Sequence, residues 1–237
     1  MGNRKTKTAL ITGASRGLGL ALARALAAEG WRLIIDARFP EVLEFAQDEL
    51  AQLTEVIAIP GDISDSSHRQ ELAQAARKFG GLDAVINNAG MLGPSPQPDL
   101  LDYPLDVLEQ VYRVNVIAQL GVLQAVNRQL KPSAHILNIT SDAGVNAYQG
   151  WGGYGSSKAA LEHLSAILAE EYPEWKIYWV DPGDMRTQMQ QDAFPGEDIS
   201  DRALPVESVP GLLSLLEGNL PSGRYIAKEV PILAGQV

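Results

Sequence analysis

Tyr154 and Lys158 are four residues apart, in the stretch Tyr-Gly-Ser-Ser-Lys. At that spacing the two side chains share one helix face, so the ammonium can lie beside the phenol oxygen. A free phenol has a pKa of about 10, and a fixed cation nearby stabilises the phenolate and lowers that value. Such a tyrosine can donate and accept a proton near neutral pH. The pair also fits an ordinary solvated helix face, so the rest of the chain has to decide between the two.

A glycine-rich turn lies between an apolar stretch at residues 8–12 and an Ala/Leu-rich segment that reaches Glu29. The first stretch is typical of a buried strand and the second of a helix. Gly13, Gly17 and Gly19 would let the backbone approach a ligand, and the helix N-terminus would offer unpaired N–H groups to a phosphate. Because the spacing differs from Gly-x-Gly-x-x-Gly, a plain tight turn remains the alternative.

Two residues of opposite charge end the next apolar stretch. Gly30 ends the first helix, residues 32–36 are typical of a second strand, and Arg38 follows Asp36. Parallel strands joined by a helix form a right-handed unit. A nucleotide bound at the glycine turn would therefore place its ribose near the end of this second strand. There the Asp36 carboxylate and the Arg38 guanidinium are alternative ligands for the ribose.

Small and polar residues also follow the later apolar stretches. Asp62 follows a strand expected at 55–60, the turn 87–90 follows one at 84–87, and Ser141 follows one at 135–140. The carboxyl ends of parallel strands share one edge of the sheet, so these turns should meet there. Asn115 instead interrupts the apolar stripe of a long helix expected at 105–130. Taken alone, it favours a hydrogen-bonded helix amide or a mild kink.

These residues need a frame of alternating strands and helices to bring them together. Strand-like and helix-like stretches alternate along the chain with no internal repeat other than this rhythm. The alternation predicts one α/β domain over residues 1–237, with seven mostly or wholly parallel strands flanked by helices. Further helices are expected at 40–53, 64–79, 154–173 and 206–217, and further strands at 176–180 and 224–227.

Together these motifs resemble the short-chain dehydrogenase/reductase family over nearly the whole chain. The resemblance implies a Rossmann-like doubly wound sheet, a nicotinamide cofactor, and hydride transfer to or from a carbonyl carbon. It rests on residues 12–19, Asp62, 87–90, Asn115, Ser141, Tyr154, Lys158 and 182–187. The cofactor-binding residues that it implies are Gly13, Ser15, Arg16, Gly17, Leu18, Gly19, Arg38, Asp62, Ile63, Asn88, Ala89, Gly90, Tyr154, Lys158, Pro182, Gly183 and Thr187.

The same resemblance implies a catalytic set of Asn115, Ser141, Tyr154 and Lys158. Tyr154 would protonate the carbonyl oxygen, and Ser141 would hold that oxygen by a hydrogen bond. Lys158 would lower the pKa of the tyrosine and bind the nicotinamide ribose, while Asn115 would position a water that links Lys158 to solvent. Hydride arrival makes an alkoxide-like oxygen that needs a proton donor, which agrees with the chemistry read from the residues.

The cofactor is expected to be NADP(H). Counted from Gly30, the acid of NAD-preferring members falls on Ala37, and Asp36, one residue earlier, should point away from the ribose because strand side chains alternate. Arg38 and Arg16 would flank the 2′-phosphate that distinguishes NADP from NAD. A bulge at the end of the strand would bring Asp36 back to the ribose.

Three further features bear on the substrate and on assembly. Asp181 stands where many family members carry Asn, and residues 228–237 lack the glycine pair that often follows the last strand. Residues 188–205 are polar with scattered Pro and Gly, and are expected to form a mobile substrate lid, with a plain solvated loop as the alternative. By resemblance, the helices at 105–130 and 154–171 imply a homodimer or homotetramer.

Composition narrows the class of protein. The net charge of -10 and the pI near 4.8 argue against nucleic-acid and anionic-membrane partners. The absence of cysteine excludes disulfides and thiolate chemistry and suits a reducing compartment, with the cytoplasm as the expected location. His68, His135 and His163 do not have a metal-ligand spacing, so no metal is expected.

The leading interpretation is an NADPH-dependent oxidoreductase that reduces a small aldehyde or ketone. Two alternatives remain open: an NAD-dependent alcohol dehydrogenase, and a non-catalytic regulator that binds NADP. No segment carries a recognisable steroid, acyl-carrier or sugar signature, so the sequence does not name the substrate.

Overall fold

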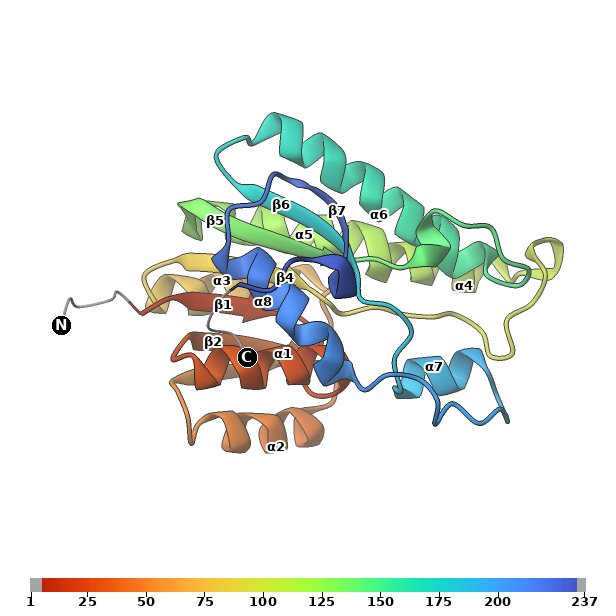
Figure 1. The fold of residues 1–237 in the computed structure, drawn as a ribbon, viewed down its shortest axis with the longest axis horizontal. Helices are drawn as coiled ribbons and strands as arrows, with labels where there is room; N and C mark the ends of the chain where they lie inside the picture. The colour runs from red at the N-terminus through yellow and green to blue at the C-terminus, as the bar shows by residue number, and fades with distance from the viewer. Residues whose placement is uncertain (1–5, 234–237) are drawn as a thin grey trace.

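The computed structural model describes residues 6–233, which form one seven-stranded sheet with helices on both faces (Figure 1). The order is β3-β2-β1-β4-β5-β6-β7, and all neighbouring strands pair in parallel. The predicted doubly wound sheet is therefore confirmed. The strands are β1 (Thr8–Ile11), β2 (Arg32–Ala37), β3 (Val56–Pro60), β4 (Leu82–Asn87), β5 (Leu130–Ile139), β6 (Lys176–Asp181) and β7 (Gly223–Ile226).

Alternating side chains divide the core into two apolar clusters, one on each face of the sheet. Ile11 and Ile35 face α1, α2 and α8, whereas Leu10 and Ile34 face α3, α5 and the end of α6. Strands buried on both faces are apolar at successive positions, which is why they are readable from the sequence. The helices are α1 (Gly17–Ala28), α2 (Pro40–Leu50), α3 (Ser66–Lys78), α4 (Leu105–Tyr112), α5 (Ala118–Val126), α6 (Gly152–Glu171), α7 (Gln188–Ala193) and α8 (Val209–Glu217).

The direction of winding reverses between β1 and β4, which are neighbours at the centre of the sheet. The chain runs outward from β1 through β2 to β3, then returns to β4 and continues through β5 and β6 to β7. At such a point the loops that leave the two strands turn in opposite directions and open a crevice, where ligands of doubly wound sheets bind.

The helix expected at 105–130 is interrupted. Residues Arg113–Ile117 form a π-helical turn between α4 and α5, and Asn115 lies in that turn with its side chain fully buried. The interruption is therefore a local widening of the helix, of a kind that is frequent at functional sites. β5 also begins earlier than expected and includes Pro132, next to an irregular register between β4 and β5.

The segment 188–205 is more ordered than its composition indicates. Thr187 caps α7 by accepting a hydrogen bond from the Gln190 N–H, and a short parallel bridge joins Met185 to Ala203. Figure 1 shows α7 outside the two helical layers that cover the sheet.

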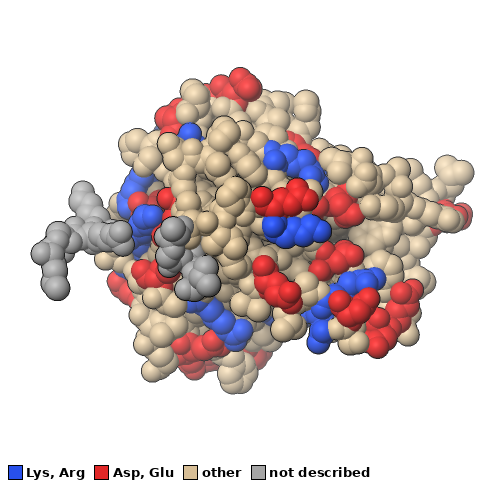
Figure 2. All heavy atoms as spheres, in the orientation of Figure 1, with Lys and Arg blue, Asp and Glu red and all other residues tan. Residues whose placement is uncertain are grey.

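Residues 1–5 and 234–237 of the predicted domain lie outside the described residues. What the sequence indicates for residues 228–237 can therefore be compared with the structure only as far as Leu233. Within the described part, none of the helices has the length and apolar character needed to cross a membrane. On the face drawn in Figure 2, the acidic and basic side chains of these residues are interspersed.

Candidate active site

A cavity of about 980 Å³ opens along the carboxyl edge of the sheet. It extends from the glycine turn and the end of β2, past the turns after β3 and β4, to Ser141, Tyr154 and the loop after β6. Every residue implied by the resemblance lines this cavity except Gly19 and Asn115, which lie behind its wall. The structure thus brings together residues that are distant in the chain.

The glycine turn lies directly against the turn after β4. Gly13 has a φ of +67°, and a Cβ there would lie 2.9 Å from the Cα of Ala89. A Cβ on Gly19 would lie 2.5 Å from the Gly13 carbonyl oxygen. The Asn88 side chain donates to the carbonyl oxygens of Thr12 and Gly13, at 2.9 and 3.1 Å. Only glycine fits these contacts, so the two turns form a single floor for a ligand.

Asp36 lies among the residues that line the cavity, but its carboxylate is buried and already hydrogen bonded. Its Oδ1 accepts a hydrogen bond from the Gly13 N–H at 2.7 Å, and its Oδ2 lies 3.0 Å from His68 Nε2. The side chain is 1% exposed. Burial raises the pKa of Asp36, and the hydrogen bonds from His68 and Gly13 oppose that rise. Asp36 therefore supports the glycine turn, a role that the sequence did not reveal.

Two guanidinium groups lie at the end of the cavity that the glycine turn and the end of β2 form. Arg16 precedes α1, Arg38 follows β2, and both line the cavity together with Asp62 and Ile63. Within residues 6–233, no carboxylate forms an ion pair with either guanidinium; Arg38 stacks on the Phe39 ring, 5.7 Å from its centroid. Their positive charge is thus left for a ligand.

Tyr154 and Lys158 lie side by side on α6, as their spacing predicts. The Lys158 ammonium is 5.4 Å from the centroid of the Tyr154 ring and donates to the Ile139 carbonyl oxygen at 2.8 Å. Both side chains are almost completely buried. Burial lowers the pKa of Lys158 to about 8, while the charge of Glu162 opposes this fall.

The pKa of Tyr154 differs from the expectation that Lys158 depresses it. Burial raises this pKa well above its ordinary value, and the negative charges of Asp181 and Asp142 raise it further. The physical reason is that the phenol is shielded from water while two carboxylates lie near it, and both effects disfavour the phenolate. The phenol is therefore protonated at neutral pH.

Ser141 follows β5 and starts a single 3-10 turn. Its hydroxyl donates to Asp142 Oδ1 at 3.0 Å and accepts from the Ala143 N–H at 3.2 Å. The Tyr148 hydroxyl donates to the other oxygen of Asp142, at 2.8 Å. The serine hydroxyl thus has a carboxylate as its present partner, and Ser141 lines the same cavity as Tyr154.

Asn115 supports the site from behind rather than lining it. Its amide donates to the Met91 carbonyl oxygen at 2.8 Å and to Ser157 Oγ at 2.9 Å, and its oxygen accepts from the Met91 N–H at 2.8 Å. A Cβ built on Gly90 would be 3.6 Å from Asn115 Oδ1 and 3.8 Å from Lys158 Nζ. Asn115 and Lys158 therefore both lie next to Gly90.

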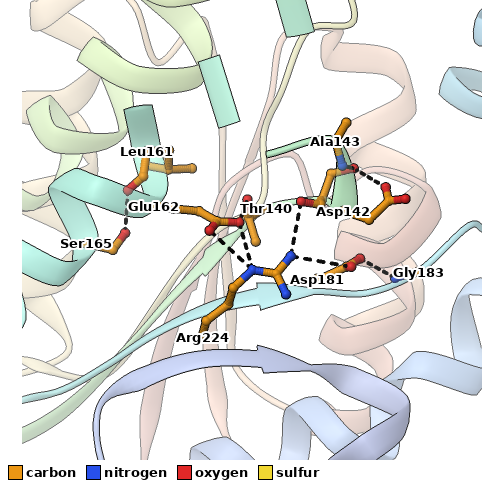
Figure 3. Close-up of polar contacts among 10 residues, drawn as sticks. Thr140, Asp142, Ala143, Leu161, Glu162, Ser165, Asp181, Gly183 and Arg224 are labelled. Atoms are coloured by element: carbon orange, nitrogen blue, oxygen red, sulfur yellow. Dashed lines mark hydrogen bonds and ion pairs between the residues drawn. The ribbon is translucent and has the colours of Figure 1, made fainter. Parts of the chain in front are cut away.

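Arg224, on β7, connects three parts of the site that sequence reasoning left separate (Figure 3). Its Nε lies 3.1 and 3.2 Å from the two oxygens of Glu162, one helical turn after Lys158. Its Nη2 donates to the Ser141 carbonyl oxygen at 3.3 Å and lies 3.7 Å from Asp181 Oδ2. The acid at position 181, which departs from the family pattern, thus has a cation beside it.

The other oxygen of Asp181 accepts from the Gly183 N–H at 2.9 Å and shapes the turn after β6. Thr140 donates to Glu162 Oε1 at 2.8 Å, so the same network also reaches the end of β5. Figure 3 shows the Arg224 side chain between the two carboxylates. The network thus ties the ends of β5 and β6 to the helix that carries Tyr154 and Lys158.

The chemistry of the lining residues fits a phosphorylated dinucleotide. Two glycines leave room for a backbone approach at the switch point of the sheet, and two unpaired guanidinium groups lie at one end. The buried phenol and ammonium lie at the other end of the same cavity. One elongated ligand could therefore contact the cations and the proton donor together. Among residues 6–233, no group of three or more metal-ligating side chains forms a metal site.

Comparisons with known proteins agree on the family. A family model described as short chain dehydrogenase matches residues 7–198. The benzil reductase ((S)-benzoin forming) of Saccharomyces cerevisiae is 36% identical over 196 residues, which are 78% of this chain and 74% of the yeast protein.

Solved structures show the same fold with different cofactors. A short chain dehydrogenase from Escherichia coli CFT073, complexed with NADPH, has a TM-score of 0.83 and 30% identity, covering 94% of this chain and 96% of that one. An NAD+-bound xylitol dehydrogenase has a TM-score of 0.82 and 26% identity, covering 93% and 96%. The fold alone thus does not decide between NAD and NADP.

Proposed function

The chain belongs to the short-chain dehydrogenase/reductase family of NAD(P)(H)-dependent oxidoreductases, and we propose that it uses NADPH to reduce an aldehyde or ketone. The observation that carries the proposal is the single cavity that connects Arg16 and Arg38 at one end with Ser141 and Tyr154 at the other. When bound, the cofactor supplies the hydride.

Arg16 and Arg38 hold the adenosine 2′-phosphate in this proposal. A phosphate accepts charge-assisted hydrogen bonds from guanidinium groups, whereas the free 2′-hydroxyl of NAD would need a carboxylate acceptor. The candidate acceptor, Asp36, is 1% exposed and is already hydrogen bonded to Gly13. Its burial supports NADP as the preferred cofactor.

Tyr154 acts as the proton donor to the carbonyl oxygen. Its raised pKa keeps the phenol protonated at neutral pH, and an alkoxide is a far stronger base than a phenolate, so transfer from the phenol to the nascent alkoxide is favourable. Ser141 orients that oxygen by exchanging its hydrogen bond to Asp142 for one to the substrate. Lys158 binds the nicotinamide ribose and, while charged, stabilises the tyrosinate that remains.

Asn115 contributes by holding the backbone at Met91, next to Gly90, at the rear of the site. The substrate enters beside α7, so residues 188–205 act as its lid. This arrangement keeps water from the reacting carbonyl when the segment is closed.

The experiment is a screen of the purified protein for oxidation of NADPH and of NADH with small aldehydes and ketones. Wild type should turn over carbonyls with NADPH, and Tyr154→Phe should lose at least about 100-fold in turnover while it binds NADPH almost as before. A Tyr154→Phe protein that keeps most of its turnover would contradict the assigned acid. Tight cofactor binding without turnover of any carbonyl or alcohol would instead indicate a binding protein.

A further inference from the structure

The wall beside the Tyr154 phenol is apolar and aromatic. Leu92, Ala143 and Tyr154 form a small apolar cluster separate from the two clusters of the sheet, and Trp151 and Ala193 pack against it. The Trp151 ring lies edge-on to the Tyr154 ring, with centroids 5.8 Å apart and an interplanar angle of 73°. This cluster also lines the cavity, so its surface faces the ligand rather than the core of the sheet.

A second aromatic ring extends this wall into the lid. The centroid of Phe194, at the end of α7, is 6.0 Å from that of Trp151. The Ser95 hydroxyl donates to the Asp192 carbonyl oxygen at 2.7 Å and so joins α7 to the loop that follows Leu92. The wall is thus built from three segments that are held against one another, and we call Leu92, Trp151, Ala193 and Phe194 the aromatic wall.

Charges of both signs lie near the phenol: the carboxylates of Asp142 and Asp181, and the Lys158 ammonium, which is 5.4 Å from the centroid of the Tyr154 ring. Burial raises the pKa of Tyr154, and the negative charges of Asp181 and Asp142 add to that rise. A substrate that carried a carboxylate or phosphate would be repelled by these two carboxylates. Neither carboxylate is left without a partner for a substrate ammonium, because Asp142 accepts a hydrogen bond from the Tyr148 hydroxyl and Asp181 lies 3.7 Å from the Arg224 guanidinium.

We propose that the substrate is a neutral ketone or aldehyde whose carbonyl carries an aryl group, and that the aryl ring packs on Trp151 and Phe194. The inference rests on the proposed function, since it names the substrate class of the same site. Rings at these centroid distances favour edge-on or offset contact with a third ring, and such contact adds to the gain from burying apolar area.

The test compares four ketones at saturating NADPH: butanone, acetophenone, 4-acetylbenzoate, and acetophenone carrying a para-trimethylammonium group. We expect kcat/KM for acetophenone to exceed that for butanone by at least about 30-fold, because the ring buries apolar area on the wall. The carboxylate should reduce kcat/KM by at least about tenfold relative to acetophenone. The ammonium should give no gain over acetophenone.

Two alanine variants test whether the preference for acetophenone over butanone arises from the aromatic wall. Phe194→Ala and Trp151→Ala should each lower the ratio of kcat/KM for acetophenone to that for butanone by about tenfold. Trp151→Phe keeps a ring and should retain most of this ratio. Phe45→Ala is the matched control, because Phe45 is an exposed phenyl side chain on α2 that does not line the cavity. Calorimetry of acetophenone binding to the enzyme saturated with NADP+ should show weaker binding in Phe194→Ala.

The outcomes separate this inference from the proposed function. If butanone is reduced with NADPH and acetophenone is not preferred, or if the carboxylate or the ammonium compound is the better substrate, the substrate class is wrong while the reductase stands. If the acetophenone preference is present but unchanged in Phe194→Ala and Trp151→Ala, the aromatic wall is not its cause. If no carbonyl is reduced, both proposals fail.

Discussion

Lys158 has a pKa of about 8, because burial of its ammonium outweighs the opposing effect of Glu162. The charged form therefore dominates below pH 8 and is lost above it. Since only the ammonium can make charge-assisted hydrogen bonds to the ribose hydroxyls, NADPH should bind most tightly below pH 8 and progressively more weakly above it, by up to tenfold per pH unit. Fluorescence titration from pH 7 to pH 9.5 measures this change.

The matched variant is Lys158→Met, in which NADPH binding should be weaker at pH 7 and nearly independent of pH over the same range. Wild-type binding that did not change across pH 8 would refute the role given to the ammonium.

Arg38 is the single side chain that we expect to determine the preference for NADPH over NADH. Arg38→Ala should lower kcat/KM for NADPH by about 10- to 100-fold, because a charge-assisted hydrogen bond to phosphate is lost, and should leave that for NADH within a few-fold. Arg77→Ala, an exposed arginine on α3 outside the cavity, serves as the control. A wild-type enzyme that prefers NADH would overturn the cofactor assignment.

At the scale of elements, the network around Arg224 links β7 to the ends of β5 and β6 and to α6. Arg224→Met leaves Glu162 and Asp181 without their shared cation, so the Ser141 backbone loses a donor and the potential at Tyr154 becomes more negative. We expect turnover to fall at least about tenfold.

Adding Asp181→Asn to Arg224→Met should recover part of this turnover, because it removes one of the two uncompensated charges. The matched control is Lys131→Met, which breaks a similarly half-buried ion pair with Asp83. This pair lies at the amino ends of β4 and β5, away from the cavity, so the variant should keep its turnover. If Arg224→Met and Lys131→Met lost equal amounts of turnover, the role of Arg224 would be purely structural.

The lid is an element whose closure can be measured directly. We expect limited proteolysis within residues 188–205 to slow by at least about fivefold when NADPH and a substrate analogue are both saturating, because α7 then packs on the ligand. NADPH alone should protect less. Cleavage at an unchanged rate with both ligands present would mean that the segment is an ordinary surface loop.

Elements were more predictable than the contacts between them. The strands could be located because residues such as Leu10 and Ile11 are buried on both faces of the sheet, which leaves continuous apolar runs. The turns that carry Gly13, Asn88 and Ser141 follow from those strands, since all of them end at one edge. Asn115 gave the only local signal of a π-helical turn, and an amide in a helix has several meanings.

The contacts that sequence reasoning missed join distant parts of the chain. Ser95 and Asp192, which hold α7 in place, are 97 residues apart, and Arg224 is 83 residues from Ser141. Neither pair has a local pattern, because a charge or hydroxyl at the surface of an element can have many partners. That Asp36 points away from a bound ribose stays a prediction, and its partner His68 could not be foreseen because that contact depends on how α3 packs.

At the scale of the whole molecule, apolar side chains remain exposed along α4, the π-helical turn Arg113–Ile117 and α6. Leu105, Ile117 and Ile167 are 73%, 64% and 41% exposed. We expect a homodimer or homotetramer that covers these helices, since burying such side chains is favourable. Light scattering at micromolar concentration should give at least twice the chain mass, and Ile117→Arg should shift the protein toward the monomer.

Phe45→Arg places the same charge on the exposed face of α2 and should leave the assembly unchanged, which makes it the control. A wild-type protein that is monomeric at micromolar concentration would contradict the prediction.

The position of Arg224 also has a consequence for the order in which the enzyme matures on the ribosome. A nascent chain that has emerged as far as α6 already contains Tyr154 and Lys158, together with the whole glycine turn. Glu162 then has no arginine beside it, and the Ser141 carbonyl lacks the donor that comes from β7. Since β7 follows every other strand of the described sheet, the network of Glu162, Ser141 and Asp181 around Arg224 is completed only when synthesis has passed residue 224. The contacts of Arg224 therefore form only after a further 70 or so residues have been added beyond Tyr154, and until then α6 is held without them.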